Sequence, residues 1–228
     1  MSTLPINLSI SRKAVDFIVM EEVSSIEYYN RALSHPTYPG GDSGVTIGIG
    51  YDLGYNSRQQ IIADWRNRIK ESDLQILLAC SGLKKEDAKR MVSNSTVKSI
   101  NIPYTEAWKV FVRNSLPRFA KNTLQIYPGL QELFPDAIGA LVSMVFNRGN
   151  DISKRPNDAE DRRKEMRAIV PLVAAKDYSG IADQIDASKR LWVGKGMNGL
   201  VTRREKEASL VRNSMRQYSN DELLNISI

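Results

Sequence analysis

The amino-acid sequence predicts a mainly α fold (α+β) that contains one small β-hairpin. Apolar residues recur with helical spacing over most of the chain, one stretch near the N-terminus alternates with period two, and glycine and proline separate these stretches. The chain has 228 residues, of which 42% are hydrophobic, and this is enough for one domain with a sizeable buried core.

The predicted elements follow in order along the chain. Residues from Ser11 to about Asn30 predict a helix that Ser9 or Ser11 caps, and TIGIGYDLG at 46–54 predicts a short strand or hairpin. Further helices are predicted at about 58–69, 72–80, 84–93, 104–125, 135–148, 160–176, 178–188 and 201–217. We expect a single domain over 1–228, with a small lobe at about 12–56, a helical lobe at about 57–218 and a loose tail at 219–228.

Composition narrows the classes of function. The only cysteine, Cys80, excludes an internal disulfide framework, and the only histidine, His35, cannot supply a multi-histidine metal site. We therefore expect neither a metal nor a cofactor. The formal charge of +6 favours polyanions, but the basic residues near position 160 are mixed with acids and form no nucleic-acid-reading motif, so we expect no nucleic-acid partner.

The apolar segments indicate neither a membrane span nor a signal peptide. The longest apolar run, Ala137 to Phe146, is far shorter than the roughly 20 residues that cross a bilayer, so it predicts a buried helix and no membrane insertion. Arg12, Lys13 and Asp16 interrupt the N-terminal apolar stretch, which no cleavage site follows. We expect a monomer that is made in the cytoplasm and leaves it by another route.

Glu22 is the first candidate for chemistry. On a helical wheel it lies within an apolar stripe that contains Val15, Ile18, Val19, Ile26 and Tyr29. A carboxyl group in apolar surroundings resists ionisation, so its pKa should rise, as a general acid near neutral pH requires. The alternative is a buried glutamate that an arginine neutralises or that caps a neighbouring helix.

Thr46 and Asp52 are the next candidates, because alternation along the strand places both on one face with Gly48 and Gly50 between them. A hydroxyl and a carboxylate across a floor of glycines can hold an attacking water beneath a sugar ring. The structural alternative is that the glycines let a hairpin bend and that Asp52 stabilises a turn.

The segment from Glu22 to TIGIGYDLG resembles the catalytic opening of phage-type lysozymes, a family that includes T-even phage lysozymes and pesticin-like muramidases. ALVSMVFNRG at 140–149 and LWVGKGMNGLVTRREKEASL at 191–210 are similar to its central helix and C-terminal lobe. The resemblance implies a lysozyme-like fold and assigns Glu22 and Thr46 to the site. The second carboxylate is open: Asp52 fits the pesticin-like spacing, whereas Asp42 lies in a glycine-rich turn.

The resemblance also implies a substrate, bacterial peptidoglycan, cleaved at the β-1,4 bond between N-acetylmuramic acid and N-acetylglucosamine without a cofactor. The sequence leaves open whether the configuration at the anomeric carbon is inverted or retained. Three further side chains are expected at the substrate: Tyr51, from a group of tyrosines that lines a groove or fills the small lobe, Asn147, and Trp192, which is as well suited to anchor a core.

Two other activities and two settings remain alternatives. The chain is either a hydrolase, a non-catalytic module that binds peptidoglycan or a receptor, or a lytic transglycosylase. As a hydrolase it would act in the periplasm or cell wall, either as a phage endolysin after release or as an injected antibacterial toxin. A toxin would require a periplasmic immunity protein as its partner in the producing cell.

Overall fold

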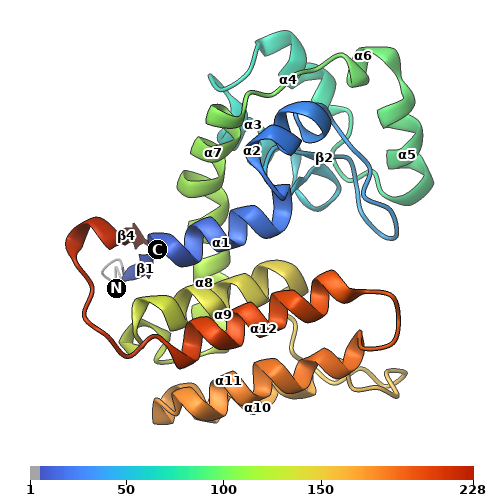
Figure 1. The fold of residues 1–228 in the computed structure, drawn as a ribbon. Helices are drawn as coiled ribbons and strands as arrows, with labels where there is room; N and C mark the ends of the chain where they lie inside the picture. The colour runs from blue at the N-terminus through green and yellow to red at the C-terminus, as the bar shows by residue number, and fades with distance from the viewer. Residues whose placement is uncertain (1–5) are drawn as a thin grey trace, which may run out of the picture. The chain divides into compact units, whose positions relative to one another are not determined.

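The computed structural model describes residues 6–228, and in them the chain is mainly helical, as the sequence predicts, with two small two-stranded sheets. The principal helices are α1 (Arg12–Val23), α2 (Ile26–Tyr28), α3 (Arg58–Trp65), α4 (Glu71–Leu78), α5 (Lys85–Ser93), α6 (Ser95–Lys98), α7 (Tyr104–Val110), α8 (Leu116–Ile126), α9 (Pro135–Arg148), α10 (Lys164–Ala175), α11 (Tyr178–Ala187) and α12 (Asn198–Arg212) (Figure 1). The strands are β1 (Asn7–Ser11), β2 (Thr46–Ile47), β3 (Tyr51–Asp52) and β4 (Leu223–Ser227). Short π-helical turns are η1 (Tyr29–Leu33) and η3 (Phe111–Ser115), and 3-10 turns are η2 (Leu53–Tyr55), η4 (Leu130–Glu132), η5 (Ser188–Leu191) and η6 (Asn220–Glu222).

The chain divides into two compact units. Unit 1 comprises Met1–Ile18 with Pro117–Ile228, described from residue 6 onward, and unit 2 comprises Val19–Leu116. Unit 2 extends far beyond residue 56, where the small lobe was expected to end, because α3 to α7 belong to the same unit as the β2–β3 hairpin. Unit 2 is therefore one continuous segment inserted into the sequence of unit 1.

In unit 1, the core is built around α9. This helix packs on α12 and β1, α12 packs on α11, and α11 packs on α10. Residues Ala137 to Val145 are all buried, so the apolar run forms a core helix as predicted. Gly139 permits a close approach, since a Cβ there would lie 2.2 Å from that of Ala14. In residues 6–228, no helix has both the length and the apolar character that a bilayer span requires.

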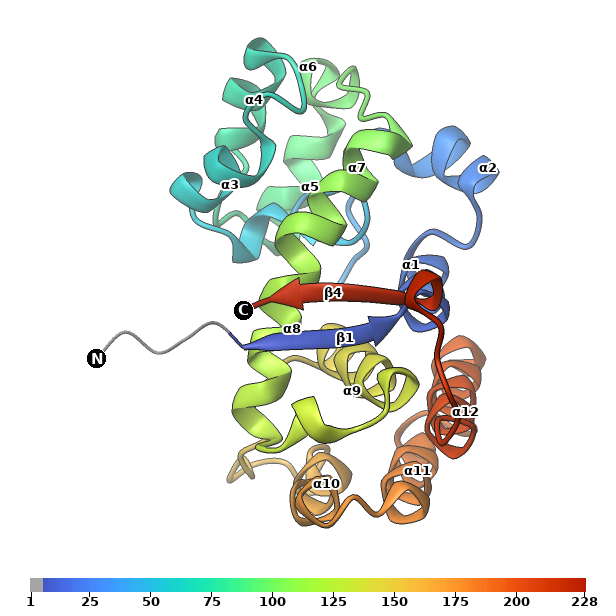
Figure 2. The same cartoon turned by 90° about the vertical axis from the view of Figure 1, so that its left-hand side faces the viewer.

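The C-terminal segment is a strand, and the prediction of a loose tail at 219–228 is wrong. β4 pairs with β1 in an antiparallel register that sets Asn7 opposite Ser227 and Ser11 opposite Leu223 (Figure 2). Ile226 is buried. The two strands lie at opposite ends of the chain, so neither can form its backbone hydrogen bonds with a neighbour in sequence.

Unit 2 holds the hairpin against a helical core. Trp65 is fully buried at the end of α3, and its ring meets that of Tyr51 edge to face at 5.5 Å. Residues 29–35 are anchored to residues 100–104: the hydroxyl of Tyr29 donates to the Ile102 carbonyl at 3.0 Å, and its ring contacts that of Tyr104 at 5.4 Å. These contacts fix the segment that joins α1 to β2.

The helices predicted after residue 57 are present with ends shifted by a few residues, and the one predicted at 104–125 consists of α7, η3 and α8 in succession. The helix predicted from Ser11 to about Asn30 is interrupted. α1 ends at Val23 rather than near Asn30, because Ser24 adopts a left-handed backbone conformation with φ +61°. Ser25 then begins a new short helix, since its hydroxyl accepts a hydrogen bond from the Tyr28 amide at 3.0 Å.

Candidate active site

Glu22 lies at the penultimate position of α1, which Ser11 begins by accepting a hydrogen bond from the Ala14 amide at 3.1 Å. Val15, Ile18 and Val19 share the face of Glu22 and are buried, so the apolar stripe is present within the helix. It does not continue to Ile26, which is 42% exposed, because the helix has already ended. Glu22 itself is half-buried.

The hairpin brings Thr46 and Asp52 together in unit 2. β2 and β3 pair antiparallel, with Thr46 directly opposite Asp52 and Ile47 opposite Tyr51. Directly opposed residues project their side chains on the same face, about 4.5–5.5 Å apart at their Cβ atoms. The prediction that these two side chains share a face is confirmed, and Glu22 belongs to the same unit.

The glycines of TIGIG turn the chain. Gly48 and Gly50 have φ values of +58° and +63° and flank Ile49 in the three-residue connection between the strands. A Cβ on Gly48 would also lie 2.9 Å from the Trp65 ring. The glycines are therefore accounted for by the bend and by packing beneath it, without any requirement for substrate.

The Asp52 carboxylate is held by backbone amides. It accepts hydrogen bonds from Gly44 N–H at 2.9 and 3.1 Å and from Gly54 N–H at 2.8 Å. Burial raises the pKa of Asp52 above its ordinary 3.8, while both amides and the charge of Lys84 act in the opposite direction. The turn-stabilising role considered from the sequence is thus present, and it fixes the carboxylate in one orientation.

Thr46 is half-buried, and its backbone is paired on both sides. On one side it lies opposite Asp52, and on the other it exchanges hydrogen bonds with Thr37 at 2.8 and 2.9 Å. Among residues 6–228, the Thr46 hydroxyl makes no hydrogen bond with another protein group. A polar group on a rigid backbone is thereby presented next to the Asp52 carboxylate.

Asp42, the other candidate for the second carboxylate, lies in an exposed turn. Its side chain is 77% exposed and forms an ion pair with Lys85 at 3.0 Å. The Asp42 carbonyl accepts a hydrogen bond from the hydroxyl of Tyr55 at 3.1 Å. The arrangement favours Asp52 over Asp42 as the partner of Thr46.

Tyr51 does not lie where a substrate could touch it, and this prediction is wrong. The side chain is only 4% exposed, and its hydroxyl donates to Asp64 Oδ2 at 2.7 Å. Because Asp52 faces the site, the neighbouring Tyr51 must face the core, as strand alternation requires. Asp64 also accepts hydrogen bonds from Gln60 and Asn114 at 2.9 and 2.8 Å. Sequence reasoning missed this buried carboxylate, for which helical spacing gives no signal.

Asn147 and Trp192 belong to unit 1, where they line the same cavity. Asn147, at the end of α9, is exposed and accepts a hydrogen bond from Arg204 at 3.3 Å. Trp192 is only 5% exposed, and its ring lies 5.3 Å from the guanidinium carbon of Arg148 and 5.7 Å from that of Arg204. The predicted stacking of Trp192 on a sugar is wrong, since arginines cover the ring.

The chemistry within reach of the site is that of carboxyl and hydroxyl groups. In the part of the chain that the structure describes, no three His, Cys, Asp or Glu side chains gather to hold a metal ion. Glu22 offers a half-buried acid, and Thr46 with Asp52 offers a hydroxyl beside an oriented carboxylate. Such groups can move a proton and position a water.

Part of the chain matches the model of a known domain family. A domain family of unknown function, DUF8812, matches residues 18–126. This segment includes the whole of unit 2 and, with it, Glu22, Thr46 and Asp52. No curated protein matches the chain.

Proposed function

We propose that the protein is a peptidoglycan hydrolase of the lysozyme type, a muramidase with a lysozyme-like fold. The observation that carries this proposal is the register of the hairpin, which sets Thr46 directly opposite Asp52 in the unit that also contains the half-buried Glu22. Glu22 and Thr46 are the residues that the resemblance assigns to the site, and Asp52 fits its pesticin-like spacing. A carboxyl acid, a fixed carboxylate and a hydroxyl are the groups that glycoside hydrolysis uses.

In the proposed reaction, Glu22 donates its proton to the glycosidic oxygen between N-acetylmuramic acid and N-acetylglucosamine. The bond from the anomeric carbon to that oxygen breaks, and a water adds to the anomeric carbon and loses its proton, to Asp52 if the configuration is inverted or back to Glu22 if it is retained. Asp52 stabilises the oxocarbenium-like transition state or positions the water, and Thr46 orients the same water. The amides of Gly44 and Gly54 hold Asp52 in place without the need for reorganisation.

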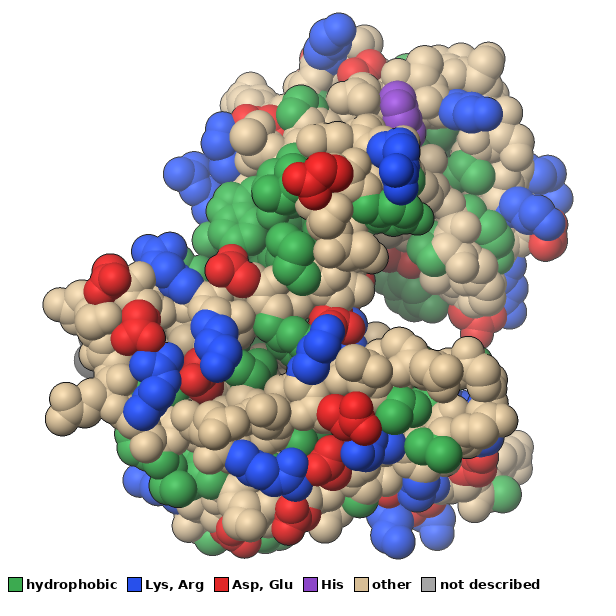
Figure 3. Space-filling model, in the orientation of Figure 1, with side chains coloured by type: hydrophobic (Ala, Val, Ile, Leu, Met, Phe, Trp, Pro, Cys, Tyr) green, Lys and Arg blue, Asp and Glu red, His purple; other side chains and the backbone are tan. Residues whose placement is uncertain are grey.

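The setting is part of the proposal. The enzyme would reach the periplasm or cell wall as a phage endolysin after release or as an antibacterial toxin after injection. The surface drawn in Figure 3 intersperses basic with acidic side chains, while the chain as a whole carries a net charge of +6. A net positive charge raises the rate of encounter with an anionic wall. A toxin would be bound and inhibited by a periplasmic immunity protein.

The deciding experiment compares wild-type protein with Glu22→Gln on purified peptidoglycan. The soluble products are reduced with sodium borohydride and identified by mass spectrometry. We expect reducible N-acetylmuramic ends from the wild type and a loss of about 10²–10⁴-fold in rate for Glu22→Gln, the usual contribution of a general acid. Glu21→Gln is the matched control, because Glu21 is the adjacent half-buried carboxylate and should keep activity.

Other products would identify the alternatives. Anhydro-muramic ends would mean a lytic transglycosylase. If folded protein sediments with insoluble peptidoglycan but releases no soluble product, the protein is a binding module. This result would contradict the proposed hydrolase activity. NMR of the first anomer formed shows whether the configuration at the anomeric carbon is retained or inverted. Retention would correspond to a separation of about 5–5.5 Å between the two catalytic carboxyl groups, and inversion to about 6.5–9.5 Å.

A further inference from the structure

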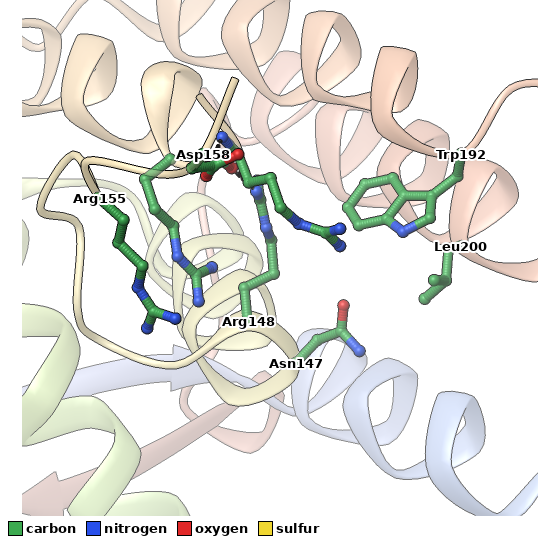
Figure 4. Close-up of a pocket in the computed structure, with 8 residues that line it drawn as sticks. Asn147, Arg148, Arg155, Asp158, Trp192 and Leu200 are labelled. Atoms are coloured by element: carbon green, nitrogen blue, oxygen red, sulfur yellow. Dashed lines mark hydrogen bonds between the residues drawn. The ribbon is translucent and has the colours of Figure 1, made fainter. Parts of the chain in front are cut away.

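A cavity of about 280 Å³ opens in unit 1 between the end of α9, the loop that precedes α10 and the segment before α12 (Figure 4). Four arginines, Arg148, Arg155, Arg162 and Arg163, line it together with Asn147 and Trp192. We call this cavity the arginine pocket. None of its residues belongs to the unit that contains Glu22, Thr46 and Asp52.

Positive charge in the arginine pocket greatly exceeds negative charge. In residues 6–228, no carboxylate lies within 4.0 Å of the guanidinium of Arg148, Arg162 or Arg163. Arg155 pairs with Asp151 at 3.3 Å, but its side chain is 65% exposed. Surface pairs of this kind contribute little and leave the cation available.

Asp158 is the one acidic side chain that lines the arginine pocket. Its Oδ2 accepts a hydrogen bond from the backbone N–H of Arg162 at 2.8 Å, so the carboxylate is engaged by the loop. Figure 4 shows Asp158 on one side of the pocket, with Asn147 and the Trp192 ring on others. One carboxylate against four guanidinium groups leaves an excess of about three positive charges by this count of the lining residues.

Arg148 shows that this excess is not relieved within the protein. The residue is only 9% exposed, its Nη2 donates to the Arg162 carbonyl, and its Nη1 is buried without a hydrogen-bond partner among the described residues. Burial, and then the charges of Arg163 and Arg204, lower the pKa of Arg148 to about 10. A buried cation of this kind is costly, and an anion in the adjoining cavity would stabilise it.

We propose that the arginine pocket binds a phosphate group, carried by a small ligand or by a phosphodiester polymer. Guanidinium groups match phosphate oxygens in paired hydrogen bonds, and they do so without being deprotonated. A volume of about 280 Å³ is slightly smaller than the range of about 300–1,000 Å³ for ligand pockets, which suits one compact charged group. Inorganic phosphate or a phosphate monoester, which is doubly charged, also neutralises the excess better than a carboxylate does, whereas a phosphodiester polymer supplies one negative charge at each phosphate. The proposal is independent of the proposed hydrolase activity.

The test measures binding of inorganic phosphate by calorimetry at fixed ionic strength, for wild-type protein and for the double variant Arg162→Gln/Arg163→Gln. Neither arginine is fully buried, so the variant should fold, which circular dichroism verifies. Arg66→Gln is the control, because Arg66 is exposed and lies in unit 2, far along the chain from the pocket. We expect at least a tenfold weaker phosphate affinity for the double variant and a change below twofold for Arg66→Gln.

Further arms identify the source of the phosphate and separate the two proposals. Tighter binding of a soluble glycerol-phosphate polymer than of inorganic phosphate would support a polymer as the ligand, and the opposite order would support a small ligand. Glu22→Gln should bind phosphate as the wild type does, whether or not it cleaves peptidoglycan. Equal phosphate affinity in the double variant and in Arg66→Gln, or equally tight binding of acetate, would overturn the proposal.

Discussion

Both oxygens of the Asp52 carboxylate accept a hydrogen bond from the backbone amide of Gly44, at 2.9 and 3.1 Å. The fit leaves no room for a larger residue, since a Cβ on Gly44 would lie 2.4 Å from Asp52 Oδ1. In the hairpin the same carboxylate therefore serves both the turn and the proposed site. Its removal should alter stability as well as activity, and the two effects have to be measured separately.

The pH dependence of stability distinguishes the contribution of Asp52. Burial, opposed by the Gly44 and Gly54 amides, raises the pKa of Asp52 above 3.8 in the folded protein. The folded state thus binds this proton more tightly than the unfolded chain does. The resulting stability is full below pH 3.8 and is lost as the pH rises through the raised pKa. We expect the free energy of unfolding of the wild type, relative to Asp52→Asn, to increase between about pH 7 and about pH 4 in urea titrations. Parallel profiles would contradict this assignment.

Ser24 is strained where α1 ends, and glycine should relieve the strain. A left-handed backbone costs an L-residue about 1–2 kcal/mol, whereas glycine adopts it freely but loses about 0.5–1 kcal/mol of conformational entropy. We expect Ser24→Gly to be neutral or to stabilise the protein by up to about 1 kcal/mol. Ser24→Val should destabilise it, because branched residues rarely adopt positive φ. Thermal unfolding ranks the two, and a less stable glycine variant would argue against strain at this position.

Tyr51→Phe tests whether this tyrosine serves the core rather than the substrate. The change removes the hydrogen bond to the buried Asp64, which should cost about 1–2 kcal/mol of folding free energy. If the protein is a hydrolase, its rate on peptidoglycan should hardly change. Tyr55→Phe is the control, because Tyr55 is 62% exposed and surface changes stay within about 0.5 kcal/mol. A large loss of activity at unchanged stability would mean that Tyr51 contacts the substrate after all.

Glu207 holds α12 to α9 in unit 1. It is fully buried, accepts a hydrogen bond from the Ser143 hydroxyl at 2.6 Å and pairs with Arg204 at 2.8 Å and Arg203 at 3.4 Å. Glu207→Ala leaves buried cations without their carboxylate and should destabilise the protein by about 3–5 kcal/mol. Glu205→Ala removes a half-exposed carboxylate from the same helix and should cost about 0–1 kcal/mol. Similar midpoints in chemical denaturation for the two variants would contradict this role.

Helices and hairpin were predictable from sequence because their signals are local. The core helix α9 follows from its apolar run, and the shared face of Thr46 and Asp52 follows from their even spacing. Alternation also places Tyr51 in the core, so expecting it at the substrate overrode a correct local signal. The break after Val23 was missed because two serines, rather than glycine or proline, form the turn.

Features that depend on distant parts of the chain were not predictable. β1 and β4 are short, and each is defined only by the other, more than 200 residues away. The hydrogen bond that joins Tyr51 to Asp64 and the arginine layer over Trp192 depend on which side chains the fold brings together. No periodicity in the sequence encodes these pairings.

The pairing of β1 with β4 has a consequence for the order in which the protein is made. Unit 1 begins before unit 2 and ends after it, so its sheet cannot close until residues 223–227 have left the ribosome. Unit 2 is continuous and can gather its contacts earlier, during synthesis. Closing the roughly 100-residue loop between the two parts of unit 1 costs chain entropy, and although this cost grows only slowly with loop length, such distant contacts slow folding. We therefore expect the slowest step in refolding to be the pairing of β1 with β4.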